Sequence, residues 1–166
     1  MSISSSIKEE ISLKKFKEKV INDFRTVSLS RETSVQGRRE VLLGKGKFGI
    51  FGDGKELPQV VMSHFFKDGD YRSGYYRDQT LLMSQNLLSA REIFSAVYGH
   101  PDKVYEKMSG GRQMAGHFLT NTVDENNWID QTKQKNHISD ISPTASQMSR
   151  LVGLGLASKI YRNNKI

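Results

Sequence analysis

Hydrophobic residues in the first part of the chain recur every three or four positions, which predicts helices with one apolar face. An amphipathic helix is expected over 7–23, with its apolar face formed by Leu13, Phe16, Val20 and Phe24. Ser6 and Glu9 have the spacing of a capping box, in which each side chain binds a free amide of the first turn. A second helix is expected over 31–43, with Gly44 as its stop.

The middle of the chain is punctuated by proline, glycine and serine, so shorter elements are expected there. In chain order the pattern predicts a helix from Pro58, a turn at 67–70, a short strand over 71–76, and helices over 78–85, 89–99 and 101–108. Ser89 and Glu92 form the second capping box of the sequence, and Gly99 is the expected end of that helix.

Helical spacing disappears over 109–141, a polar stretch with Trp128 near its middle. We expect a loop here, and a loop of this length inside a compact domain is usually functional or disordered. A helix then follows, with apolar residues at helical spacing: Met148, Leu151, Val152, Leu156 and Ile160. Small residues occupy every fourth position of it: Ala145, Ser149, Gly153 and Ala157. This stripe predicts close packing against another backbone, either in the core or at a subunit interface.

Composition describes an ordinary globular chain. It has 166 residues, 36% of them hydrophobic and 26% charged, which fits one domain. No apolar run is long enough to span a membrane, and the start lacks the basic and apolar regions of a secretory signal. The absence of cysteine excludes disulfides and thiolate metal sites. Together these features predict a cytoplasmic protein without a membrane partner.

The formal net charge of +7 raises the question of an anionic partner. The basic residues are spread along the chain, and no segment interleaves them with aromatic residues as a nucleic-acid groove would. Solvated surface charge is therefore the favoured interpretation. A basic nucleic-acid-binding protein is the third of our functional hypotheses, and nucleic acid is not the expected partner.

A glycine-rich tract over 44–54 matches a dinucleotide-binding pattern through Gly44, Gly46 and Gly49. That motif requires a strand before it and a helix opening from it, whereas a helix is predicted to precede this tract. A flexible loop that turns the chain is the favoured interpretation.

The stretch Gly74-Tyr75-Tyr76-Arg77-Asp78-Gln79-Thr80 combines two phenols, a guanidinium and a carboxylate. An arginine beside aromatic donors can bind a phosphate or carboxylate through two parallel hydrogen bonds. Taken alone, the stretch is equally compatible with a surface turn before a helix.

Three motifs follow one another along the chain: Gly74-Tyr75-Tyr76-Arg77-Asp78, then Gly111-Arg112-Gln113-Met114 with His117, then Ser142-Pro143-Thr144-Ala145-Ser146-Gln147. In this order, with the small-residue helix after the third, they resemble the alpha chain of the thiamine-diphosphate-dependent dehydrogenases of 2-oxo acid dehydrogenase complexes. The branched-chain type, including bacterial alpha/beta fusions, looks closest, and the similarity runs over 38–161.

The resemblance implies an α/β parent fold with a doubly wound thiamine-diphosphate-binding domain. Within it, this chain would be an incomplete, mostly helical amino-terminal part with one or two short strands. The implied division is amino-terminal helices over 1–43 and a partial cofactor-binding domain over 44–166, with the carboxy-terminal half absent.

The resemblance also implies a reaction, the oxidative decarboxylation of a small 2-oxo acid. Thiamine diphosphate attacks the keto carbon, carbon dioxide leaves, and the acyl group passes to a lipoyl group. The implied partners are a beta chain or beta region of the dehydrogenase and the lipoylated acyltransferase core.

By motif, the cofactor-binding residues would be Tyr75, Tyr76, Arg77, Ser142 and Thr144. Arg77 would hold the diphosphate with Tyr76 beside it, and the backbone at Ser142 and Thr144 would meet the aminopyrimidine. From the residues alone, Tyr76 and Arg77 could be a surface pair, and Ser142 could simply cap the last helix.

Some relatives in this family bind a potassium ion with groups that match Pro143, Ser146 and Gln147. Hard oxygen ligands on one turn make such a site reasonable. His117 is a weaker catalytic candidate, because no catalytic partner lies near it in the sequence. No catalytic residue is assigned ahead of it.

The chain also departs from the family pattern. Relatives carry a Gly-Asp-Gly triplet and an Asn-Asn pair after the small-residue helix, which together bind magnesium and the diphosphate. Gly52-Asp53-Gly54 precedes all three motifs, so we interpret it as coincidence and expect no magnesium site in this chain. The glutamate that activates the cofactor belongs to the beta part. The chain alone is therefore expected to be inactive, and a non-catalytic interaction subunit that completes a partner's fold is the alternative.

Overall fold

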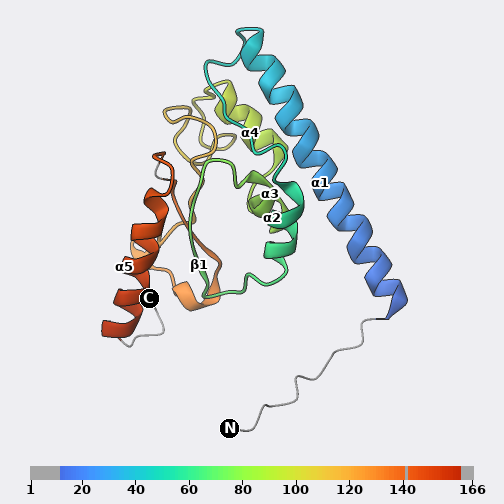
Figure 1. Cartoon of the computed structure of the whole chain (residues 1–166). Helices are drawn as coiled ribbons and strands as arrows, with labels where there is room; N and C mark the ends of the chain where they lie inside the picture. The colour runs from blue at the N-terminus through green and yellow to red at the C-terminus, as the bar shows by residue number, and fades with distance from the viewer. Residues whose placement is uncertain (1–11, 141, 162–166) are drawn as a thin grey trace.

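The computed structural model of the chain describes residues 12–140 and 142–161. It is mostly helical with a few short strands, as the sequence predicts. In chain order the helices are α1 (Leu13–Leu42), α2 (Glu56–Ser63), α3 (Gln79–Ser84), α4 (Ala90–Val97) and α5 (Ser146–Tyr161). The strands are β1 (Tyr71–Ser73), β2 (Val123–Asp124), β3 (Asn127–Trp128) and β4 (Asn136–Ile138), with a 3-10 turn, η1 (Gln131–Lys133), before β4. Figure 1 shows α1 along one side of the strands and α5 along the other.

One continuous helix, α1, replaces the two helices expected over 7–23 and 31–43. The predicted break is wrong because no glycine or proline interrupts 24–30, so the helical hydrogen bonds continue. The side chain of Ser12 caps the helix, and the predicted capping box lies outside the described residues. Gly44, with φ of +74°, follows its end as predicted.

The second half of α1 packs on α3 through small polar side chains rather than large apolar ones. Gln79 Nε2 donates to the carbonyl oxygen of Ser30 at 3.0 Å and to Ser34 Oγ at 2.9 Å. The hydroxyls of Ser30 and Thr80 are 2.6 Å apart. All four residues are buried, and the small side chains of Ser30, Ser34 and Thr80 let the two helices approach closely. This contact fixes α3, which directly follows the Gly74–Asp78 stretch.

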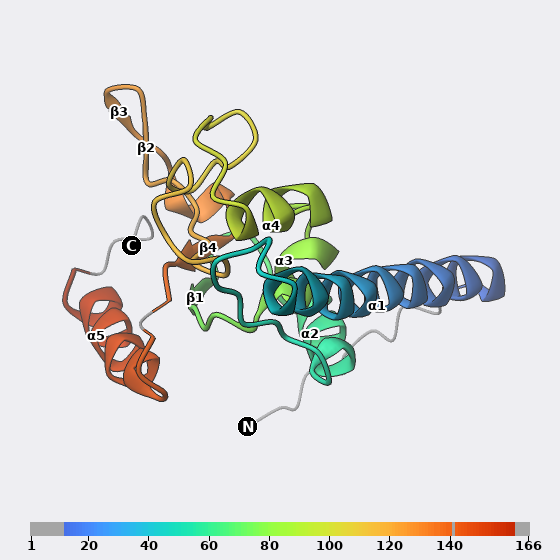
Figure 2. The same cartoon turned by 90° about the horizontal axis from the view of Figure 1, so that it is seen from above.

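The first half of α1 extends beyond the other elements, as Figure 2 shows. Its apolar face is exposed there, with Phe16 at 55% and Phe24 at 71% of full exposure. The amphipathic spacing in the sequence is therefore correct as a helix signal. It does not mark a face that is buried within the described part of the chain.

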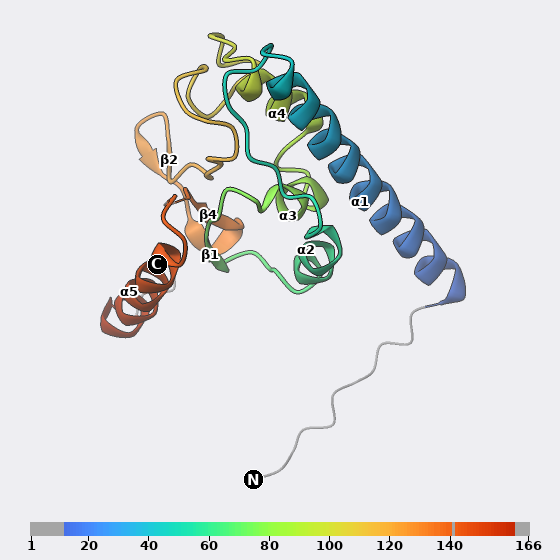
Figure 3. The ribbon, with the colours of Figure 1, turned by 45° about the horizontal axis from the view of Figure 1, so that its top comes forward.

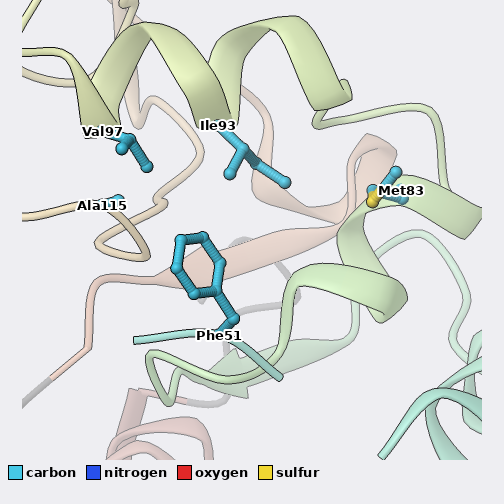
Figure 4. Packing of buried hydrophobic residues seen from close by; sticks show 5 residues of the cluster. All are labelled: Phe51, Met83, Ile93, Val97 and Ala115. Carbon is cyan, nitrogen blue, oxygen red and sulfur yellow. The ribbon is translucent and has the colours of Figure 1, made fainter. Parts of the chain in front are cut away.

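The hydrophobic core gathers between α3, α4 and two loops, as Figure 4 shows. It consists of Phe51, Met83, Ile93, Val97 and Ala115. Gly37 of α1 lies directly against the ring of Phe51, where a side-chain carbon would collide with the ring. The glycine that interrupts the helical pattern of the sequence therefore has a packing role.

The predicted helix around Ser89 is confirmed, and the one predicted over 101–108 is wrong. Both hydrogen bonds of the Ser89–Glu92 capping box are present, and Gly99 follows the helix with φ of +67°. Residues 101–108 form turns instead. The carboxylate of Glu106 accepts from the amides of Met108, Ser109 and Gly111, which closes a loop rather than a helix.

The polar stretch predicted as a loop over 109–141 contains a strand that the sequence pattern does not reveal. β4 pairs in parallel with β1, in a register that places His137 opposite Arg72. The crossover between them contains α3 and α4, as a parallel connection requires. β2 and β3 form a short antiparallel hairpin. The expectation of an unstructured loop is corrected for these residues.

Helix α5 is present as predicted but has little cover, and Ala145, expected in its small-residue stripe, precedes the helix with φ of +70°. Arg150 Nη1 donates to the carbonyl oxygen of Ser139 and ties the helix to the end of β4. Figure 3 shows α5 standing beside β1 and away from α1. Most of its apolar side chains are exposed, and apart from the helix's own backbone no atom of the described residues lies within 4 Å of a side-chain carbon built on Gly153. The small-residue stripe therefore has no close backbone partner in the described part of the chain.

Candidate functional site

The turn that carries the two tyrosines is held by the carboxylate of Asp78. One oxygen of Asp78 accepts from the amide of Tyr75 and from Nε of Arg72, both at 2.9 Å. Arg72 is buried on β1, and burial lowers the pKa of its guanidinium while Asp78 partly offsets the effect. Gly74 allows the close approach, because a side-chain carbon there would lie 2.7 Å from the carbonyl oxygen of Ile138. The turn is therefore rigidly attached to the β1–β4 pair.

Tyr75 and Tyr76 form a joined pair of phenols. Their hydroxyls are 2.7 Å apart and their ring centroids 4.1 Å apart. The hydrogen bond with Tyr76, followed by one with Thr144, lowers the pKa of Tyr75. The hydrogen bond with Tyr75 raises the pKa of Tyr76. The first and third sequence motifs thus meet at these hydroxyl groups.

Arg77 lies next to this pair, with its guanidinium carbon 5.6 Å from the centre of the Tyr76 ring. Its carbonyl oxygen accepts from Gln59 Nε2 at 2.9 Å, which fixes its backbone. Its Nε is buried and has no hydrogen-bond partner among the described residues. Arg77 borders a hollow of about 310 Å³ that Arg38 and Asp53 also line.

Arg38 and Asp53 are joined by an ion pair beside this hollow. The hydrogen bond from Arg38 lowers the pKa of the Asp53 carboxyl. Asp53 belongs to the Gly-Asp-Gly triplet that we interpret as a coincidental match, and in the structure its carboxylate binds arginine.

A second cavity, of about 140 Å³, brings residues of all three motifs together. It is lined by Phe48, Ile50, Tyr76, Met114, Ala115, His117 and Ser142. Gly116 has φ of +101°, and a side-chain carbon there would lie 2.8 Å from the carbonyl oxygen of Tyr76. A glycine at this position lets the second motif lie directly on the first. The order of motifs along the chain therefore corresponds to a shared location in space.

His117 has polar partners on both ring nitrogens. Nδ1 lies 3.1 Å from the carbonyl oxygen of Met114, and Nε2 lies 3.3 Å from Ser142 Oγ and 3.5 Å from Asp140 Oδ2. The Asp140 side chain is only 1% exposed, and its Oδ1 has no hydrogen-bond partner among the described residues. Burial raises the pKa of the Asp140 carboxyl, and the charge on His117 opposes this.

Asp140 is the site residue that sequence reasoning missed. It stands alone in a polar segment, 23 positions after the histidine it accompanies, and no spacing rule connects the two. The only signal is its position two residues before Ser142, at the start of the third motif.

The predicted potassium ligands lie at the start of α5. The carbonyl oxygen of Pro143 accepts from the amide of Ser146 at 3.2 Å, and Gln147 Oε1 is buried without a hydrogen-bond partner among the described residues. The alternative in which Ser142 caps the last helix is wrong. The helix begins at Ser146, and the Ser142 hydroxyl faces His117 instead.

In the part of the chain that the structure describes, no helix combines the length and apolar character needed to cross a membrane.

Comparison with known proteins gives a distant similarity to an alpha subunit of a 2-oxo acid dehydrogenase. The relative is the 2-oxoisovalerate dehydrogenase subunit alpha of Bacillus subtilis (strain 168), which is 26% identical over 150 residues. The alignment covers 89% of this chain and 40% of the relative, so the chain spans less than half the length of that protein. A scan against models of protein families finds no match.

Proposed function

We propose that the chain forms part of the alpha region of a thiamine-diphosphate-dependent 2-oxo acid dehydrogenase and supplies one wall of its cofactor site. The observation that carries the proposal is that the three motifs meet at one cavity, which Tyr76, His117 and Ser142 line. Arg77 lines a second hollow that shares Ile50 with this cavity. The distant similarity to a 2-oxoisovalerate dehydrogenase subunit supports the same class. The parent fold would be the doubly wound α/β fold of that class.

The residues present fit an anionic cofactor group. Arg77 has a buried Nε–H that finds no acceptor among the described residues, and such a donor costs free energy unless a ligand satisfies it. Arg38 lines the same hollow, where it is paired with Asp53, so Arg77 is the arginine there that has no acidic partner within the described part of the chain. An arginine held by a rigid turn is well suited to a diphosphate, because its planar donors match phosphate oxygens. This supports Arg77 as the diphosphate-binding residue.

The other predicted contacts would each have a separate task. The ring of Tyr76, paired with Tyr75, would contact the Arg77 guanidinium and hold it in place. The backbone at Ser142 and Thr144 would orient the aminopyrimidine. Bound thiamine diphosphate supplies the carbanion chemistry, while the protein supplies binding and orientation. Magnesium would be held by groups outside this chain, and a potassium ion at Pro143, Ser146 and Gln147 is part of the proposal.

The proposal assigns only part of a site to this chain, so we expect no turnover by the chain alone. Its partner would be a beta chain or beta region of the dehydrogenase, and a lipoylated acyltransferase core would accept the acyl group. The substrate would be a small 2-oxo acid of the branched-chain type.

The test combines cofactor binding and decarboxylation. The chain is mixed with thiamine diphosphate and magnesium, with and without a candidate beta chain, and binding is measured by calorimetry. Where binding occurs, Arg77→Gln should weaken it at least about tenfold, since a charge-assisted hydrogen bond is removed. Arg25→Gln, on the projecting part of α1, is the matched control and should leave it unchanged. No binding in either mixture would overturn the proposed function, and decarboxylation by the chain alone would overturn its dependence on a partner.

A non-catalytic interaction subunit is the second candidate, because α5 has little cover and the β1–β4 sheet ends after two strands in the described residues. The β1–β4 sheet has two strands, and several apolar residues of α5 are exposed, with Val152 at 73%. A partner that extends the sheet and covers α5 would bury both. Size-exclusion chromatography with a candidate beta chain tests this, and separate elution at micromolar concentration would exclude it.

A further inference from the structure

Gln59, on α2, places its side-chain amide at the start of α3. Its Nε2 donates to the carbonyl oxygen of Arg77 at 2.9 Å, and its Oε1 accepts from the amide of Leu81 at 3.0 Å. These partners settle which way the side-chain amide faces, because a carbonyl group can only accept a hydrogen bond and a backbone N–H can only donate one. One side chain therefore joins two backbone groups that lie four residues apart.

In a continuous helix the same two groups would bond to each other, since each amide donates to the carbonyl oxygen four residues before it. Here the amide of Gln59 stands between them and makes a hydrogen bond with each. Helix α3 begins at Gln79, so Arg77 belongs to the turn that precedes it. The side chain of Asp78 does not cap the helix and is bound to the turn and to β1 instead. Gln59 supplies the capping contact from another helix.

The carbonyl group of Arg77 is enclosed on a second side by Gly52, because a side-chain carbon on that glycine would collide with the oxygen. Helix α2 is itself fixed to α1, since Arg31 donates two hydrogen bonds to the carboxylate of Glu56, at 2.6 and 2.8 Å. The backbone of Arg77 is thus held by α2 and by the glycine-rich loop, which leaves few orientations open to it.

The side chain on this backbone has a polar group ready for a ligand. Nε of Arg77 is buried and meets no acceptor in the part of the chain that the structure describes. Its guanidinium carbon lies 5.6 Å from the centre of the Tyr76 ring. An arginine side chain loses much conformational entropy when it is held in one place. A fixed backbone removes part of that cost before the ligand arrives, which favours binding.

We propose that Gln59 is a positioning residue that acts through Arg77: its amide keeps Arg77 in the turn, at the border of the hollow that Arg38 and Asp53 also line. Gln59 lies outside all three motifs, so their pattern does not reveal this role. The ligand group for which Arg77 is held is a diphosphate, whose oxygens accept from the planar guanidinium donors. That use rests on the proposed function, whereas the holding of Arg77 does not.

Hydrogen exchange at the arginine side chains tests this role in the full chain without any cofactor. Nitrogen-15 and carbon-13 NMR assigns each Nε–H and follows its exchange with water. We expect the Nε–H of Arg77 to exchange at least about tenfold more slowly than that of Arg25, which is exposed on α1. In Gln59→Met it should exchange about tenfold faster than in the unmodified chain, the factor expected when one hydrogen bond is lost.

Two other arginines report whether the fold is retained. Nε of Arg31 is bound to α2, and Nε of Arg72 is bound to the turn, so both should exchange in Gln59→Met as they do in the unmodified chain. Unchanged exchange at Arg77 overturns the positioning role. Faster exchange at all three arginines together also overturns it, because Gln59 would then act on the fold as a whole.

Gln134→Met is the matched control. Gln134 also donates its side-chain amide to a backbone carbonyl oxygen at 2.9 Å, that of Asn121, in a different part of the chain. Its replacement should leave the exchange of the Arg77 Nε–H unchanged. An effect equal to that of Gln59→Met would show that the contact between Gln59 and Arg77 is not the cause, and would overturn the proposal.

A double-mutant cycle connects the role to cofactor binding. With thiamine diphosphate, magnesium and a candidate beta chain, Gln59→Met should weaken binding about fivefold in the unmodified chain and have no further effect in Arg77→Gln. A loss of equal size in both backgrounds would mean that Gln59 acts without Arg77, which overturns the proposal. Absence of binding in the unmodified chain overturns the proposed function, while the exchange measurement still decides whether Gln59 holds Arg77.

Discussion

Arg72 and His137 are register partners on the parallel strands β1 and β4, and Nη1 of the arginine donates to Nδ1 of the histidine at 3.1 Å. The other ring nitrogen of His137 then carries the hydrogen and donates to Gln85 Oε1 at 2.8 Å. The histidine is 1% exposed, and burial, followed by the charge of Arg72, lowers its pKa from 6.5 to about 3. The only parallel strand pair in the described residues therefore contains a histidine that must stay neutral.

This arrangement predicts that acid destabilises the protein well above the range where carboxylates titrate. The unfolded chain binds a proton at His137 below pH 6.5, whereas the folded chain resists it down to about pH 3. The contribution of His137 to the free energy of unfolding is therefore fully present above pH 6.5. It is lost as the pH falls, by about 2 kcal/mol at pH 5. Urea unfolding between pH 7 and pH 5 measures the slope. It should largely disappear in His137→Gln and persist in His100→Gln, and an equal slope in both variants would contradict the prediction.

Gly116→Ala should destabilise the fold by about 1–3 kcal/mol, because the residue has φ of +101° and an added carbon would press on the carbonyl oxygen of Tyr76. Gly153→Ala is the matched control. Nothing lies within 4 Å of the new carbon, and alanine favours a helix by about 1 kcal/mol over glycine. Thermal unfolding should show a lower midpoint for the first variant and an equal or higher one for the second. The reverse order would mean that Gly116 does not hold the two motifs together.

The polar contact between α1 and α3 should be a strong determinant of stability. Gln79→Leu removes the amide that donates to Ser30 and Ser34 and leaves their buried oxygens without that donor, which should cost about 1–3 kcal/mol. Glu32→Leu, at an exposed position of the same helix α1, should change the free energy of unfolding by less than about 0.5 kcal/mol. Chemical denaturation of both variants provides the comparison. Similar losses of unfolding free energy in both variants would show that the buried hydrogen-bond network does not stabilise the fold more than a surface side chain does.

Gly153→Leu should leave the isolated chain as stable as before, since the position is open. If a partner packs closely on the small-residue stripe, the same change should abolish co-elution with that partner, because a leucine side chain would hold the backbones apart. Lys159→Leu, near the end of the same exposed helix, is the control and should retain binding. Binding by Gly153→Leu at unchanged affinity would show that the stripe is not the contact surface.

Local signals in the sequence were sufficient for most helices. The Ser89–Glu92 box, Gly99 and Gly44 each act on the backbone within a few residues, so their effect does not depend on the rest of the fold. The same reasoning failed at 24–30, where the absence of a breaker decides that the helix continues. It also failed at 101–108, where Glu106 satisfies the amides of a loop.

The site was predicted in part. The motif order pointed to Tyr76, His117 and Ser142, and the fold places all three at one cavity. The carboxylate of Asp140 was not found, because its significance comes from burial beside His117 rather than from spacing. The roles assigned to these residues, and to Arg77, remain predictions that the experiments above address.

The sequence by itself determined most of the helices and the three motifs, because caps, breakers and apolar spacing act over a few residues along the chain. Only the tertiary structure decided that a polar segment supplies β4, that Asp140 lies beside His117, and that the apolar faces of α1 and α5 are exposed. A parallel strand pair joins residues 65 positions apart, as between Arg72 and His137, and burial depends on every element that packs nearby. Neither property can be obtained from a local window of residues.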